Sequence, residues 1–181
     1  MRLRPRAEVI CFKGNKVLAA YADDKDGGYV YFPGGGIEPN ESPIQAAKRE
    51  AYEETDRTVI NCTVAHPATV QEWPGGYKGK PKWASDGFTG GFTYWMTGST
   101  SEKPIHSHIA HQHYDHDSRF SWKPLDEVCR RLRHEKGGWE DDAKVRLAII
   151  ENHILAREVH KEAEAATSPV LWLPTLHTMV Q

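Results

Sequence analysis

Three glutamates, Glu50, Glu53 and Glu54, follow Arg49 a short distance beyond a glycine-rich turn at residues 34–36. In a helix, positions i, i+3 and i+4 lie on one face, so the three carboxylates are expected to share a face. Like charges at this spacing destabilise an isolated helix by about 0.2–0.5 kcal/mol per pair. A divalent cation would offset that repulsion, and Mg²⁺ or Mn²⁺ prefers carboxylate and water oxygens as ligands. The spacing therefore predicts a metal site, with a solvated acidic helix face as the alternative.

Such a site suits the hydrolysis of a phosphoanhydride. The oxygens of a pyrophosphate carry negative charge that repels an incoming hydroxide. A hard cation neutralises this charge and lowers the pKa of a bound water. Arg49 is expected to orient one of the carboxylates through charge-assisted hydrogen bonds, unless it makes only an ordinary surface ion pair.

The segment resembles the Nudix box of the Nudix hydrolases, Gly-x5-Glu-x7-Arg-Glu-U-x-Glu-Glu-x-Gly-U, where U is a bulky aliphatic residue. Six of its seven fixed residues occur within residues 35–57, namely Gly35, Glu41, Arg49, Glu50, Glu53 and Glu54. The seventh, a glycine, is Asp56 here, and two aliphatic positions are Ala51 and Arg57. Aspartate tolerates the left-handed conformation of a helix C-cap better than most residues. Val59 or Ile60 is expected to supply the apolar contact that Arg57 does not.

The resemblance implies a role for each of these side chains. Mg²⁺, with Mn²⁺ as a substitute, would be bound by Glu50, Glu53, Glu54 and the carbonyl of Gly34. Of these, Glu53 and Glu54 would be the primary ligands, and Glu50 would be a further ligand or a base. Glu50, Glu53 and Arg49 would together form the catalytic set.

Substrate contacts are expected from a long connection at residues 72–88, which is rich in glycine, lysine and aromatic residues. Loops of this kind usually carry specificity. Lys78 and Lys80 are candidates to meet a phosphate, and Trp73 and Tyr77 to stack on a base. A surface loop with scattered aromatic residues is the alternative.

A second loop, at residues 105–117, contains five histidines. Nudix hydrolases often recruit an extra carboxylate from a late loop, and Asp115 or Asp117 is favoured here over Glu102 because both lead into a strand at 119–122. In an extended chain, His106 and His108 would point to one face, as would His111 and His113, a spacing capable of binding a transition metal. A solvated loop over the active site is the favoured interpretation, and the metal site is the alternative.

Composition is compatible with a soluble enzyme, and 181 residues are expected to form one domain. The 181 residues are 39% apolar, and 23 basic against 25 acidic residues leave a net charge of −2, which argues against nucleic acid as the main partner. We find neither a signal peptide nor an apolar run long enough to span a membrane. Three separated cysteines without a CxxC pair favour free thiols in a reducing cytoplasm.

Alternating elements are expected to carry these residues. Strands are expected at 7–12, 16–21, 29–32, 58–65, 68–73, 90–97 and 119–122, with helices starting at Pro43 and covering 124–133 and 141–165. Ser42 should cap the first helix, with Gln45 completing a capping box, and Asp141 should cap the last. The first helix should pack on the sheet through Ile44, Ala47, Ala51 and Thr55. The last should pack through Val145, Ala148, Ile149, Leu155 and Val159.

The order of elements agrees with what the resemblance implies, an α/β/α sandwich with a mixed sheet. We expect residues 1–167 to form a single Nudix domain, and the apolar tail at 168–181 to pack on the body or on a second subunit of a homodimer. The expected activity is metal-dependent cleavage of a pyrophosphate bond in a small nucleotide, such as ADP-ribose, a dinucleoside polyphosphate, a nucleotide sugar or a nucleoside triphosphate. The alternatives are a Nudix-fold module that senses a nucleotide without cutting it, and an enzyme that acts on the 5′ end of RNA.

Overall fold

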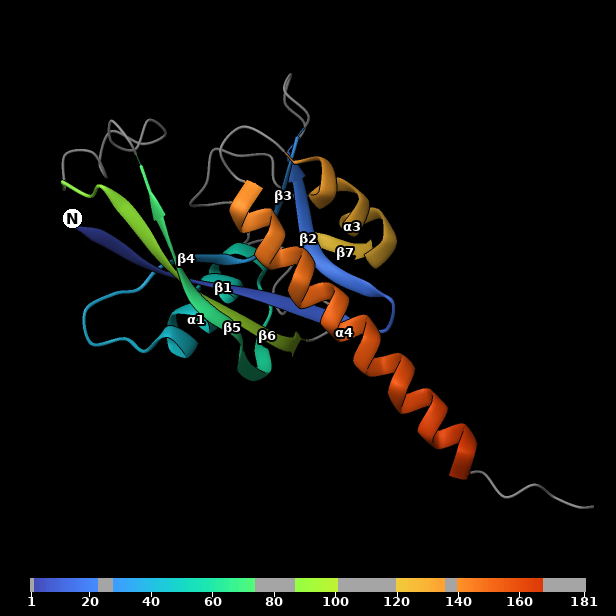
Figure 1. Cartoon of the computed structure of the whole chain (residues 1–181). Coiled ribbons are helices and arrows are strands. Elements are labelled where there is room, and N and C mark those ends of the chain that lie inside the picture. The colour runs from blue at the N-terminus through green and yellow to red at the C-terminus, as the bar shows by residue number, and fades with distance from the viewer. Residues whose placement is uncertain (1, 23–27, 74–86, 101–119, 136–139, 168–181) are drawn as a thin grey trace, which may run out of the picture.

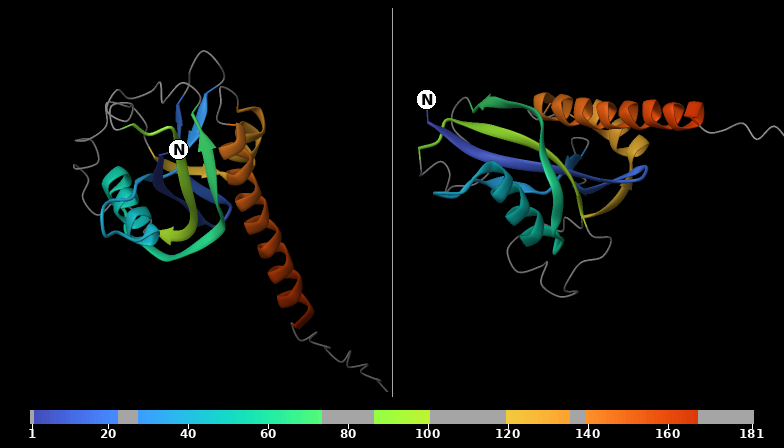
Figure 2. Two further views of the ribbon diagram at one scale, coloured as in Figure 1. Left: turned by 60° about the vertical axis from the view of Figure 1, so that its left-hand side comes forward. Right: turned by 90° about the horizontal axis from the view of Figure 1, so that it is seen from below.

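The computed structural model describes residues 2–22, 28–73, 87–100, 120–135 and 140–167. Its elements are β1 (Leu3–Lys13), β2 (Lys16–Ala22), β3 (Tyr29–Tyr31), β4 (Gly34–Gly36), α1 (Pro43–Thr55), β5 (Val59–Glu72), β6 (Gly90–Thr100), β7 (Ser121–Pro124), α3 (Leu125–His134) and α4 (Glu140–Thr167). The strands form one layer, with α1 on one side and α4 on the other (Figures 1 and 2).

The sheet of the described residues has the order β3-β2-β1-β6-β5, with β4 paired to β1 and β7 to β2. Strand β1 is antiparallel to β2 and β4 but parallel to β6, so the sheet is mixed, as expected. Different halves of β1 meet different partners. The first half pairs with β4, where Glu8 stands opposite Gly34, and the second half pairs with β2.

Two apolar cores lie on opposite faces of the sheet. On the α1 face, the buried residues are Ala7, Val9, Cys11, Leu18, Ala46, Ala47, Ala51, Val59 and Met96. On the other face, residues of α3 and α4 such as Val128 and Ile150 pack with Ile10, Val30, Phe32 and Trp95. This arrangement confirms the α/β/α class.

Local signals in the sequence set both ends of α1. Ser42 accepts a hydrogen bond from the Gln45 amide, and the Gln45 side chain accepts one from the Ser42 amide, which completes the expected capping box. Asp56 ends the helix in the left-handed conformation (φ 54°, ψ 37°), as expected for the residue that replaces the glycine. Val59 is buried and Ile60 is 54% exposed, so Val59 supplies the apolar contact.

Three expectations about the elements were wrong. The ranges 58–65 and 68–73 form one strand, β5, because changes of register on either side of His66 accommodate Pro67 in a strand at the edge of the sheet. The glycine-rich turn forms the short strand β4, because its backbone pairs with β1. Ile44 is 37% exposed and does not seat α1.

Helix α4 also differs from its expected form. It includes Glu140, so Asp141 lies within the first turn, where it binds Lys144 at 2.8 Å. Its first half covers the sheet, but its second half extends past the body (Figure 1). Leu155 and Val159 are therefore each 59% exposed, and the expected apolar stripe ends before them. None of the helices within the described ranges has an apolar stretch long enough to cross a membrane.

Candidate active site

Strand β4 brings its backbone against the side chains of α1. A side-chain carbon on Gly35 would lie 2.3 Å from the Glu50 carboxylate, and one on Gly34 would lie 2.5 Å from the carbonyl oxygen of Ala7. Real atoms do not approach this closely, so a side chain at Gly34 would clash with the backbone of β1, and one at Gly35 would displace the Glu50 carboxylate. The glycine-rich segment is thus what allows β4 to fit between β1 and the acidic part of α1.

Arg49 connects this segment with three carboxylates. Its guanidinium donates two hydrogen bonds to Glu41, each of 2.9 Å, one to Glu50 at 2.9 Å and one to Glu53 at 3.1 Å. A further bond of 2.8 Å goes to the carbonyl of Gly36. Arg49 is only partly exposed, so these bonds are better shielded from water than those of an ordinary surface pair. They fix the orientation of Glu50 relative to β4.

Glu54 lies on the same side of α1 as Glu50, one turn further along. The backbone amide of Gly34 donates a hydrogen bond of 3.0 Å to Glu54 Oε2. Burial raises the pKa of Glu54 to about 8; the Gly34 amide and Arg6 oppose this rise, and the nearby charges of Glu50 and Glu8 add to it. Burial likewise raises the pKa of Glu50, against the lowering effect of Arg49. Burial thus makes the charged forms of both carboxylates costly unless a cation lies beside them.

Glu53 is placed differently from its two neighbours. Its side chain is 49% exposed, whereas that of Glu50 is 7% exposed. Within the described residues, no three acidic, histidine or cysteine side chains converge into a cage for a metal ion. The expectation that three carboxylates share one face thus holds for Glu50 and Glu54, with Glu53 on the flank.

The donor set nevertheless fits a hard divalent cation. Mg²⁺ is usually held by one or two carboxylates together with substrate phosphates and water, and not by a cage of protein ligands alone. Glu50 and Glu54 provide such a pair of carboxylates beside the backbone of Gly34. Burial raises the pKa of both carboxylates, and a bound cation would stabilise their charged forms.

Among the expected substrate-binding residues, only Trp73 is described. Its indole lies 3.2 Å from the position of a side-chain carbon on Gly91, and its N–H donates to Gln71 at 3.2 Å. Gly91 pairs with Arg4 of β1, two residues before Arg6, which pairs with Gly36 of β4. Outside the described residues lie Tyr77, Lys78, Lys80, Glu102, Asp115, Asp117 and the histidines at 106 to 116.

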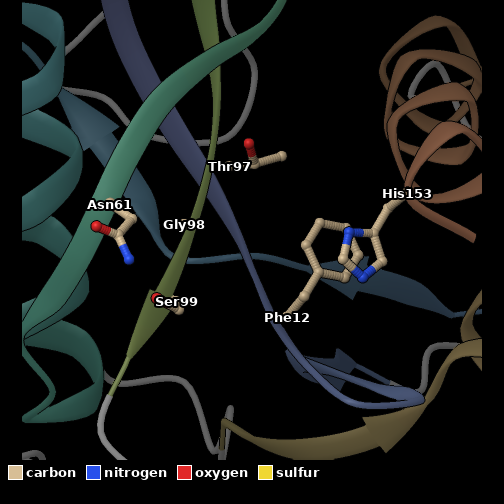
Figure 3. A pocket seen from close by; sticks show the side chains of 6 residues that line it. All are labelled: Phe12, Asn61, Thr97, Gly98, Ser99 and His153. Atoms are coloured by element: carbon tan, nitrogen blue, oxygen red, sulfur yellow. The ribbon is translucent and has the colours of Figure 1, made fainter. Parts of the chain in front are cut away.

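An open groove lies elsewhere, between the sheet and α4 (Figure 3). Its lining residues are Phe12, Asn61, Thr97, Gly98, Ser99 and His153. The rings of Phe12 and His153 stack with centroids 3.7 Å apart. Because α4 covers the face opposite α1, this groove is separate from the carboxylates of the candidate site.

Sequence reasoning missed a buried charged cluster next to the site. Arg146 of α4 donates to both oxygens of Glu8, at 2.8 and 2.7 Å, and lies 3.7 Å from Glu135. Asp142, also buried, is one helical turn before Arg146. The sequence did carry a signal for this cluster. Asp142 lies two helical turns and Arg146 one turn before the buried Ile149 and Ile150, so all four are on one face of α4. Partners more than 100 residues away were not visible in the sequence.

Comparison with known proteins bears on the family of the chain. The model of the NUDIX domain matches residues 2–146. An 8-oxo-dGTP diphosphatase of Proteus vulgaris is 45% identical over 65 residues, which are 35% of this chain and 58% of that protein. The chain thus matches little more than half the length of this curated relative.

Solved structures show a likeness of fold. A NUDIX hydrolase from Nitrosomonas europaea has a TM-score of 0.56 at 18% identity, over 86% of this chain and 90% of the other. An ADP compounds hydrolase has a TM-score of 0.54 at 13% identity, over 86% and 74%. The MutT protein of Bacillus halodurans has a TM-score of 0.51 at 21% identity, over 71% and 72%. At these identities the likeness shows the fold alone.

Proposed function

The chain belongs to the Nudix family, and on this premise we propose that it is a hydrolase that uses Mg²⁺ to cleave a phosphoanhydride bond in a nucleoside diphosphate derivative. Mn²⁺ is the expected substitute for Mg²⁺. Proteins of this family generally use divalent metals and act on small nucleotides. The proposal therefore concerns this chain's own residues, its metal and its substrate.

The observation that carries the proposal is that the carboxylates of Glu50 and Glu54 are both held against the backbone of β4. Glu50 is fixed by Arg49 at 2.9 Å and Glu54 by the Gly34 amide at 3.0 Å. A module that only senses a nucleotide has no need for two acidic groups whose buried charges repel each other. A site that binds a cation and a phosphate does need them.

The residues of the chain divide the work between them. Glu50, Glu54 and the carbonyl of Gly34 would hold the cation, with Glu53 joining them by rotation of its exposed side chain. A bound divalent cation supplies positive charge that neutralises phosphate oxygens and lowers the pKa of water. Arg49 keeps Glu50 in place, and Glu50 or Glu53 would accept the proton of an attacking water.

The 8-oxo-dGTP diphosphatase is the relative with the highest local identity reported above, so a nucleoside triphosphate belongs among the first substrates to test. Within the described residues, Trp73 is the candidate for stacking on the base, because its ring lies against Gly91 of β6, the strand next to β1. The further candidates Tyr77, Lys78 and Lys80 would extend this surface.

The test is a screen of turnover with Mg²⁺, with Mn²⁺ and with the metal removed by a chelator. The substrates are 8-oxo-dGTP, unmodified nucleoside triphosphates, ADP-ribose, dinucleoside polyphosphates and nucleotide sugars. Glu54→Gln should reduce turnover by about 10²–10³-fold, because it removes one charge at the reacting phosphates while keeping the shape. Glu38→Gln, at an exposed position before α1, is the matched control and should match the wild type.

Two results would overturn the proposal. The first is turnover of no substrate, with tight nucleotide binding retained, which would favour the sensing module. The second is full turnover by Glu54→Gln in excess Mg²⁺. Capped or triphosphorylated RNA in the same screen tests the remaining alternative.

We further propose that residues 1–167 are one domain and that the apolar segment 168–181 packs on the body or on a second subunit. Cys11, Cys62 and Cys129 are free thiols, which supports a cytoplasmic location. Sedimentation of the chain with and without residues 168–181 tests the homodimer.

A further inference from the structure

Arg6 lies one strand away from β4, the strand whose backbone contacts Glu50 and Glu54. It is on β1, in register with Gly36 of β4 on one side and with Thr93 of β6 on the other. Arg4 points to the same face, and a side-chain carbon on Gly36 would lie 2.7 Å from its Nη2. Two guanidinium groups therefore border β4 on the side away from Glu50 and Glu54.

The side chain of Arg6 has donors to spare. Its Nε is buried and has no hydrogen-bond partner among the described residues, and its guanidinium forms no ion pair with any of them. A buried donor without an acceptor costs free energy that an incoming acceptor would recover. Arg6 as a whole is partly exposed, so a ligand can reach it.

Two carboxylates attract Arg6 without binding it. Its charge lowers the pKa of Glu54, on the α1 side, and the pKa of Asp142, at the start of α4. No ion pair within the described residues joins Arg6 to either carboxylate, and its buried Nε has no hydrogen-bond partner among them. The buried Arg146 is instead fully paired with Glu8.

We propose that Arg6 binds a phosphate group of the substrate, so that the diphosphate lies across β4 between this guanidinium and the carboxylates of Glu50 and Glu54. The planar fork of arginine matches the spacing of two phosphate oxygens. The inference rests on the proposed function for its substrate class, a nucleoside diphosphate derivative. Arg6 would position the phosphate and takes no part in proton transfer.

The experiment measures binding of inorganic pyrophosphate by calorimetry, with the full-length protein and without added metal. Arg6→Met should weaken binding by about 10–100-fold, because it removes charge-assisted hydrogen bonds. Arg6→Lys keeps the charge but loses the fork, so its affinity should be intermediate. Arg130→Met, at an exposed arginine on α3, is the matched control and should bind as the wild type does. With a substrate from the screen, Arg6→Met should raise KM far more than it lowers kcat.

The outcomes separate this inference from the proposed function. Arg6-dependent binding of pyrophosphate by a chain that hydrolyses nothing would support the phosphate site while the proposed function failed. Binding by Arg6→Met within twofold of the wild type, or no binding by the wild type, would overturn the phosphate site even if the chain were an active hydrolase. If Arg6→Met does not fold, as judged by circular dichroism, unchanged affinity of Arg6→Lys overturns it.

Discussion

The guanidinium of Arg146 holds both carboxylate oxygens of Glu8, at 2.8 and 2.7 Å, with the two side chains only 7% and 3% exposed. The pair joins α4 to β1 at the point where β1 meets Gly34. It is flanked by the rings of Phe32 and Trp95, each 5.8 Å from the guanidinium carbon. The wall of the candidate site is thus anchored to a helix on the other face of the sheet.

Removing Arg146 should destabilise the fold strongly. Arg146→Met leaves the carboxylates of Glu8, Glu135 and Asp142 buried without their cation, which should lower the free energy of unfolding by about 3–5 kcal/mol. Urea unfolding measures this change. Arg133→Met, which breaks a surface pair with Glu151, is the control and should cost about 0–1 kcal/mol. A cost below 1 kcal/mol for Arg146→Met would show that the buried pair does not anchor α4.

Glu135 should make stability depend on pH. Burial raises its pKa from 4.5 to about 7, although Arg146 and the Val30 amide oppose the rise and Glu8 and Asp142 add to it. Between these values the folded state binds more protons than the unfolded state, so the contribution of Glu135 to stability should fall as the pH rises from about 4.5 to 7 and then level off. Glu135→Gln should flatten this fall, whereas Glu158→Gln, at an exposed site on α4, should not. Identical urea midpoints across pH 5–8 for the wild type and Glu135→Gln would contradict the assignment.

Gly35→Ala should damage the site more than the fold. The added carbon would lie 2.3 Å from the Glu50 carboxylate and push it out of place. A displacement of about 1 Å at a reacting centre can cost about 10²-fold in turnover, which kcat with the best substrate of the screen would show. Gly14→Ala, in the β1–β2 hairpin, meets nothing within 4 Å but has φ +57°, so it should lower stability by about 1–2 kcal/mol and leave kcat unchanged. Equal kcat in both variants would refute the role of this close contact.

Arg49→Lys should lower turnover while leaving the protein folded. An ammonium group is a point charge, and it does not reproduce the paired hydrogen bonds to Glu41 and the simultaneous bond to Glu50. Loss of a group that orients a metal ligand typically costs about 10–100-fold in metal affinity or activity. We therefore expect a higher Mg²⁺ concentration for half-maximal turnover. Arg133→Lys is the control, and a normal Mg²⁺ dependence of Arg49→Lys would argue against a role in orienting Glu50.

Local features of the chain were determined by the sequence. Ser42 and Gln45 set the start of α1 because a capping box forms within one helical turn. The spacing of Arg49, Glu50 and Glu54 put them on neighbouring faces of that helix for the same reason. The hairpin at residues 13–16 and the family resemblance also depend only on residues close together in the chain.

Only the tertiary structure decided which distant groups meet. The pairing of Arg146 with Glu8 joins residues 138 positions apart, and the register of β1 with β4 and β6 brings Arg6 beside Gly36. The same holds for exposure, since Leu155 has the spacing of a core residue but is 59% exposed on α4, whose second half extends past the body (Figure 1). Hydrogen bonds within a turn are set by a few neighbouring residues, whereas strand register and packing depend on the whole chain, so the sequence determined the acidic helix and the tertiary structure determined its surroundings.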